Sequence, residues 1–154
     1  LCSVWCIAQD TPAPAPVTLN FAAVGMSYNR GGDPAIAGTA AYARRLSEHT
    51  YSFTLMDALP VKEHPNAIAT QVGTGILQRI ASIGKVDLYL PVAAGISWSG
   101  TNSRWSWTGG AMAAYRIPKL GVYVYPNIRW SLVDVAPGVS GYQNTFGVLF
   151  GGPW

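Results

Sequence analysis

The sequence predicts an all-β fold, an eight-stranded antiparallel up-and-down transmembrane β-barrel, from three observations. Asp, Glu, Lys and Arg make up 11% of the 154 residues, against roughly 25% in an ordinary soluble domain. No segment supplies the stretch of about 20 apolar residues that a spanning helix needs. After residue 17 the chain instead alternates between apolar and polar positions in segments of roughly ten residues that end in turn residues. Because lipid offers the backbone no hydrogen-bond partners, a closed barrel is the other structure that can span it.

The N-terminal segment, residues 1–8, reads as the remnant of an export signal, because it is mostly apolar and ends in small residues before Gln9. The alternative is an ordinary apolar N-terminal strand. Residues 9–16 contain TPAPAP and predict a stiff, extended lead-in, which leaves 17–154 as the barrel domain. Both cysteines fall in the first segment, so we expect neither a disulfide framework nor a thiol or metal site in the mature chain.

Eight segments are predicted as strands. They are 17–29, 36–46, 51–59, 67–80, 86–99, 104–117, 121–133 and 144–150. The second, fourth and sixth connections are tight turns, and the others contain the Gly, Pro and Asn residues of longer loops, as at 60–66 and 134–143. An even number of strands, with short turns at one end and longer loops at the other, is the plan of a bacterial outer-membrane barrel.

The two faces of each strand predict which side meets lipid. In the fifth segment Leu88, Leu90 and Val92 alternate with Asp87 and Tyr89. Were the apolar face turned inward, the outside would be Gly, Ala, Ser and Tyr with very little Lys or Glu, which is a poor coat in water. We therefore expect the apolar face to meet lipid and the polar face to line a lumen small enough for side chains to fill.

The third segment follows the same rule, which predicts that Tyr51, Phe53 and Leu55 face lipid. The first segment does not alternate cleanly, and a β-bulge near Ala22-Ala23 would reconcile its two halves. Four glycines are expected to leave room in the lumen for tyrosines and arginines. They are Gly73, Gly75, Gly95 and Gly110.

Aromatic residues collect near the predicted strand ends, as expected for the two membrane interfaces. The long-loop end holds Tyr28, Trp98, Trp105, Trp107 and Trp130, and the short-turn end holds Tyr42, Tyr51, Tyr115 and Trp154. If aromatic residues merely favoured any β-surface, they would be spread along the strands.

Charged and amide side chains on the inward faces predict a polar cluster in the lumen. Its members are Arg45, Arg79, Asp87, Arg116, Asn127 and Arg129. Buried charges need partners, and Asp87 is the acid expected inside, so surplus arginine implies water or a small anion there. The alternative is that the arginines reach water or lipid phosphates at the barrel ends.

The strand count, the loop asymmetry and the last strand together resemble the small eight-stranded outer-membrane barrels of the OmpA/OmpX type. Such proteins end in an aromatic residue preceded by alternating apolar residues, a signal that the barrel-insertion machinery reads. Here the resemblance assigns that signal to Phe146, Val148, Phe150 and Trp154. Gly152 and Pro153 interrupt the alternation, which predicts that the strand breaks before Trp154.

No catalytic, phosphate-binding or metal-ligating pattern is evident, and His49 and His64 are read as solvated turn residues. The net charge of +3, with no basic cluster beyond Arg44-Arg45, argues against nucleic acid. We therefore expect a non-enzymatic barrel without cofactors in the bacterial outer membrane, with a structural, surface or interaction role. Its expected partners are membrane lipids, lipopolysaccharide, the insertion machinery and, as an option, another membrane protein. The alternatives are a soluble secreted barrel that binds a small apolar ligand and a narrow channel.

This interpretation also predicts how substitutions divide between the two faces. Arg in place of Leu90 or Val124, both expected near mid-strand, should cost roughly 2–4 kcal/mol if that face meets the bilayer core. Ala in place of the lumen-facing Ser97 or Thr108 should matter much less.

Overall fold

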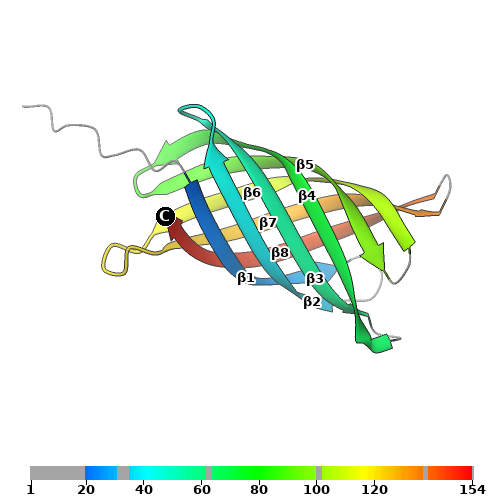
Figure 1. Cartoon of the computed structure of the whole chain (residues 1–154). Coiled ribbons are helices and arrows are strands. Elements are labelled where there is room, and N and C mark those ends of the chain that lie inside the picture. The colour runs from blue at the N-terminus through cyan, green and yellow to red at the C-terminus, as the bar shows by residue number, and fades with distance from the viewer. Residues whose placement is uncertain (1–19, 31–34, 62–63, 100–101, 137–138, 154) are drawn as a thin grey trace, which may run out of the picture.

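The computed structural model describes residues 20–30, 35–61, 64–99, 102–136 and 139–153. The strands are β1 (Asn20–Arg30), β2 (Ala35–Arg45), β3 (Thr50–Val61), β4 (His64–Ile83), β5 (Val86–Ser99), β6 (Asn102–Arg116), β7 (Tyr123–Ala136) and β8 (Val139–Pro153). Each strand pairs antiparallel with its neighbours in sequence, and β8 pairs with β1, so the sheet closes as an eight-stranded barrel (Figure 1). The predicted fold class is confirmed. Within these residues no helix is long and apolar enough to cross a bilayer.

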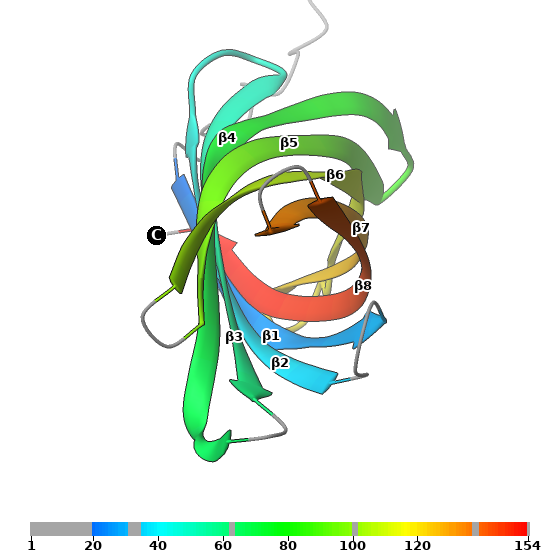
Figure 2. The same cartoon turned by 90° about the vertical axis from the view of Figure 1, so that its right-hand side faces the viewer.

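The barrel has two unlike ends. The first residue of β1 and the last of β8 lie at the same end, together with the connections 46–49, 84–85 and 117–122 (Figure 1). We call this the terminal end and the other the distal end. Figure 2, viewed from the distal end, shows the strands arranged in a closed ring.

The predicted difference in loop length is wrong, because strands occupy most of the segments expected to be long loops. Hairpins β3–β4 and β7–β8 extend at the distal end, where Val61 pairs with His64 and Ala136 with Val139. Both hairpins contain a register shift, after Pro60 and after Asp134. The Gly, Pro and Asn content of these segments indicated loops, but continued pairing satisfies their backbone hydrogen bonds instead.

The bulge expected near Ala22-Ala23 is also absent, since β1 keeps one continuous register with both β2 and β8. The first strand failed to alternate because Phe21 faces inward, where its ring stacks on Tyr125 with centroids 5.2 Å apart. The break expected at Gly152-Pro153 is wrong for a related reason. Pro153 pairs with Phe21, and β7 stops pairing with β8 at Gly151, so the proline lies at an edge where its missing N–H is tolerated.

The predicted faces of β5, β6 and β7 are confirmed, with Val92, Trp107 and Ile128 exposed outside and Tyr89, Thr108 and Arg129 buried inside. Strand β3 is the exception, because its orientation is inverted. Phe53 and Leu55 are buried in the core, and Tyr51 packs against it.

The inversion leaves polar residues of β3 and β4 on the outer wall, where they bond within the wall itself. The hydroxyls of Thr54 and Thr74 lie 3.3 Å apart, and the Thr74 hydroxyl also donates to the carbonyl of Phe53. The Thr50 hydroxyl donates to Gln78 at 2.9 Å. Such bonds reduce the penalty of placing hydroxyl and amide groups against an apolar surrounding.

Several inward-facing glycines allow the strands to approach closely in this narrow barrel. A Cβ placed on Gly75, Gly95 or Gly110 would collide with a carbonyl oxygen of the neighbouring strand. The expectation that these glycines make room for tyrosine rings was therefore incomplete, because the first group they accommodate is adjacent backbone.

We predict that Gly95→Ala destabilises the barrel by about 1–3 kcal/mol, because the added methyl group overlaps the carbonyl of Val72. Gly38→Ala is the matched control, since nothing lies within 4 Å of a Cβ at that position. Urea unfolding in detergent micelles, followed by tryptophan fluorescence, measures both. Equal midpoints for the two variants would contradict the close approach.

Candidate functional site

The lumen is filled in layers, and the distal layer is polar. Its centre is an ion pair between Asp57 of β3 and Arg129 of β7, each 5% exposed. Arg129 donates through Nη1 to Oδ2 of Asp57 at 2.7 Å and through Nη2 to Oδ1 at 3.1 Å. The Thr39 hydroxyl donates to Oδ1 at 2.6 Å, and Asn127 accepts from Nε of Arg129 at 3.0 Å. The pair is bidentate and further hydrogen-bonded, as buried charges require.

Smaller polar contacts continue this layer around the wall. Gln71 donates to the hydroxyls of Ser106 and Thr108 at 3.2 and 3.3 Å, and the hydroxyls of Thr108 and Ser131 lie 2.8 Å apart. The buried hydroxyl of Ser97 has no partner among the described residues. The layer is therefore a hydrogen-bonded network in which the Ser97 hydroxyl lacks a partner among the described residues.

An apolar layer lies next, toward the terminal end. Phe53, Leu55, Leu77 and Leu149 are buried in it, and the space left among these side chains is about 20 Å³. A water molecule needs polar partners as well as room. This layer therefore separates the polar network from the terminal opening.

The terminal end opens into a vestibule walled by rings. Phe21 stacks on Tyr125, which stacks on Tyr123, with interplanar angles of 15° and 16°. On another wall Tyr51 meets Tyr89 edge to face at 5.9 Å. The vestibule has a volume of about 330 Å³. Its charged lining residues are Arg45, Glu48, Arg79 and Asp87.

The residues predicted to form one lumen cluster therefore divide between two places. Asn127 and Arg129 belong to the distal network. Arg45, Arg79 and Asp87 line the vestibule, and Arg116 is exposed at its rim. Sequence reasoning missed Asp57, because the predicted orientation of β3, which is opposite to the observed one, placed that side chain toward lipid.

The outer wall is the second candidate site, and it carries almost no charge. At the levels between Arg30 near the distal end and Arg44 near the terminal end, the outward positions of the described strands contain no Asp, Glu, Lys or Arg. Asp134 lies past this level, in the β7–β8 hairpin. Such a surface is unfavourable in water and suits hydrocarbon.

Most of the predicted interface aromatics are exposed on this wall. They are Tyr28, Trp98, Trp105 and Trp107 toward the distal end, Trp130 at the middle of β7, and Tyr42 and Tyr115 toward the terminal end. Tyr51 does not belong to the set, since it lies inside between Phe21 and Tyr89. Its outward prediction was wrong because β3 is inverted. Trp154 lies outside the described residues.

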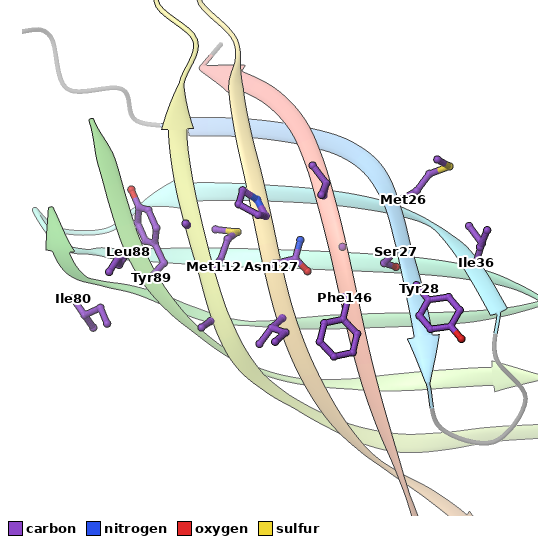
Figure 3. Close-up of a pocket in the computed structure, with 16 residues that line it drawn as sticks. Met26, Ser27, Tyr28, Ile36, Ile80, Leu88, Tyr89, Met112, Asn127 and Phe146 are labelled. Carbon is purple, nitrogen blue, oxygen red and sulfur yellow. The ribbon is translucent and has the colours of Figure 1, made fainter. Parts of the chain in front are cut away.

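A broad apolar depression of about 770 Å³ crosses the strands of the wall (Figure 3). Met26, Tyr28 and Phe146 lie at one side of it and Ile80 and Leu88 at the other (Figure 3). Small or compact side chains of β6 and β7, such as Ala111, Ala113 and Pro126, lie between them. The depression is lined mainly by hydrocarbon side chains.

In the last strand, Phe146, Val148 and Phe150 are all exposed on the outer wall. They keep the alternation that the C-terminal signal requires, and β8 reaches Pro153 without interruption. Whether the insertion machinery reads these residues stays a prediction.

His49 lies beside Arg79, whose Nη2 is 2.8 Å from Nδ1 of the imidazole, and beside Glu48, 3.7 Å from Nε2. All three lie at the rim of the terminal end. Among the described residues, no group of three or more His, Cys, Asp or Glu could hold a metal ion.

Comparison with solved structures identifies the fold. Neisserial surface protein A (NspA) aligns with a TM-score of 0.66 at 7% identity, covering 88% of this chain and 96% of that chain. The N-terminal β-barrel domain of Pseudomonas aeruginosa OprF aligns with a TM-score of 0.56 at 12% identity, covering 88% and 99%. This chain has the fold of the small outer-membrane barrels.

Two further similarities support the same fold. Ail, the attachment invasion locus protein of Yersinia pestis, aligns with a TM-score of 0.56 at 15% identity, covering 87% of this chain and 97% of Ail. A de novo designed transmembrane β-barrel aligns with a TM-score of 0.55, also at 15% identity. No family model and no curated protein sequence matches the chain. The similarity therefore lies in the barrel fold rather than in sequence.

Proposed function

We propose that the protein is a non-enzymatic barrel of the bacterial outer membrane with a structural, surface or interaction role in the cell envelope. The main support for this proposal is the outer wall, which has no charged residue between the levels of Arg30 and Arg44 among the described strands. Large apolar side chains cover it on every strand from β1 to β8, whereas the buried charges Asp57 and Arg129 lie inside. This inside-out distribution suits a cylinder surrounded by lipid.

The same wall supports the proposed partners. Membrane lipids and lipopolysaccharide would contact the apolar belt and its exposed aromatics, and the depression in Figure 3 suits acyl chains. The barrel-insertion machinery would act on the C-terminal strand during assembly. Another membrane protein is a further partner for the wall, where the bonded hydroxyls of Thr54 and Thr74 form a polar patch.

The two alternative functions have less support. A soluble barrel that binds an apolar ligand needs an internal apolar cavity, but the apolar layer leaves about 20 Å³. A channel needs a wet path, but Leu55, Leu77 and Leu149 pack across the lumen. We therefore expect no steady conductance.

Membrane partition and planar-bilayer recording test the proposal together. The protein is expected to remain in the membrane fraction until detergent is added, and to give no steady current in a planar bilayer. Release into the aqueous phase without detergent would overturn the membrane assignment. Stable unitary currents would overturn the closed lumen and support a channel.

A further inference from the structure

We infer that the vestibule at the terminal end is a binding site for a small anionic ring compound, one that carries a carboxylate or phosphate beside a flat ring or sugar face. The site is built by all eight strands, each of which contributes at least one lining residue. The vestibule is a concave site of about 330 Å³ whose lining is divided between aromatic rings and charged or amide side chains, which suits a ligand with both a ring face and an ionic group.

The cavity is blind, which favours binding over passage. Tyr89 and Tyr125 are buried at its inner side, and the layer around Leu77 closes the lumen behind them. A ligand entering from the terminal end would meet ring faces and then packed hydrocarbon. Tyr125 is covered by Phe21 and Tyr123 in the stack, so these two outer rings, which are half-buried, offer the faces on which a ring ligand can lie.

Charge around the opening of the vestibule favours an anion, although the four charges of its own lining, Arg45, Arg79, Glu48 and Asp87, balance. Among the described residues the cations there are Arg44, Arg45, Arg79, Lys85, Arg116 and Lys119, and the acids are Glu48 and Asp87. A neighbouring hollow of about 440 Å³ shares Asp87 and Tyr123 with the vestibule and adds Lys85 and Arg116 to its rim. Excess cationic charge around a concave opening raises the local concentration of anions.

Two arginines are placed to hold the acidic group. Arg45 and Arg79 both line the vestibule, and each is fixed by a contact to the β2–β3 connection. Nε of Arg45 donates to the carbonyl of Ser47 at 2.8 Å, and Nη2 of Arg79 donates to the carbonyl of Glu48 at 3.2 Å. Nε and Nη2 of Arg79 also face Nδ1 of His49, so Nη1 of Arg79 remains to donate to a carboxylate or phosphate oxygen beside the guanidinium of Arg45.

Asn20 gives an independent indication of a missing polar partner. Its Oδ1 is buried against the vestibule and has no hydrogen-bond partner among the described residues. Buried acceptors are normally satisfied. Asn20 lines the vestibule, and a rotation of its side chain toward the vestibule would let a ring hydroxyl of the ligand supply the donor, which suits a sugar phosphate or a hydroxylated aromatic acid.

Titration calorimetry of the full chain in detergent micelles tests this site with two matched pairs of probes. One pair is 4-hydroxybenzoate and its neutral methyl ester, and the other is glucose 6-phosphate and glucose. At least one anion is expected to bind about tenfold more tightly than its neutral partner, as expected for a charge-assisted bond. The anion that binds better distinguishes an aromatic acid from a sugar phosphate.

Variants locate the binding. The double variant Arg45→Gln/Arg79→Gln is expected to remove the advantage of the anion, and Tyr123→Leu to weaken both members of the pair by removing a ring face. Arg30→Gln, an exposed arginine near the distal end, is the control and should leave binding unchanged. Circular dichroism checks that each variant keeps its strands.

Three results would overturn the inference. They are equal binding of the anion and its neutral partner, an equal loss in Arg30→Gln, and no heat from any probe at about 10 mM, which is above the dissociation constant of a weak site. Binding is measured in micelles and does not need a bilayer. Its failure would therefore leave the membrane proposal standing, and failure of the membrane proposal would leave the vestibule to be judged by these probes.

Discussion

Replacing Arg129 by Met is expected to lower the free energy of unfolding by about 3–5 kcal/mol, because it leaves the carboxylate of Asp57 buried without its cation. Asp57 would keep the Thr39 hydroxyl as a donor, which cannot balance a full charge at 5% exposure. Urea unfolding in micelles, followed by tryptophan fluorescence, measures the loss.

Two further variants separate charge from packing. The double variant Asp57→Leu/Arg129→Met removes both charges and should recover most of the loss, since a buried pair is often replaceable by hydrocarbon. Ser131→Ala removes one neutral bond, to Thr108, and should cost about 1 kcal/mol. If the double variant were as unstable as Arg129→Met, the loss would reflect packing rather than an unpaired charge.

Arg in place of Val92 or Ile128 is expected to cost about 2–4 kcal/mol in a bilayer, because both side chains project from mid-strand positions of the outer wall. Val92 is 60% exposed and Ile128 is 41% exposed. Val124, proposed from sequence for this test, lies at the second position of β7, so Arg there should cost less. Unfolding of the protein reconstituted in phospholipid vesicles gives the measurement.

Leu120→Arg is the matched control, since Leu120 is 71% exposed in the connection between β6 and β7, outside the strands. Its change should stay within about 0.5 kcal/mol. On the lumen side, Ser97→Ala should be close to neutral, because its buried hydroxyl has no partner among the described residues. If Arg at Val92 or Ile128 changed the free energy of unfolding no more than Arg at Leu120 does, the outer wall would not contact lipid.

The alternation of apolar and polar side chains was sufficient to predict most of the strands and the closed barrel. In β5, β6 and β7 one face is strongly apolar and the other holds Ser, Thr, Asn or charged residues, so the pattern determined both the strands and their orientation. Turn residues located the connections at the terminal end, as Gly84 illustrates with a φ of 61°, although they did not predict the lengths of these connections relative to the distal ones. These are local properties, which a sequence displays directly.

Strand β3 was misread because both of its faces are mixed. Tyr51, Phe53 and Leu55 form the more apolar face, and lumens of small barrels also contain packed hydrocarbon. Asp57 has the same parity as these three residues, and a carboxylate at mid-strand is incompatible with a lipid face. That single residue was the signal that could have corrected the orientation of the strand.

The pairing within the lumen could not be predicted in the same way. Asp57 and Arg129 are 72 residues apart in the chain, and the sequence does not reveal which inward positions share a level, because the registers of four successive strand pairs separate them. The vestibule was missed for the same reason. Its tyrosines and arginines come from every part of the barrel and meet only after closure.

Strands β3 and β7 occupy opposite walls of the cylinder, which links the Asp57–Arg129 pair to the order of assembly. In a sheet that has not closed, β3 and β7 are four strands apart and these two charges cannot pair across the lumen. The bidentate contact is therefore made only in the closed barrel. A half-assembled barrel with free edges is thus disfavoured by the same two side chains that join the finished walls.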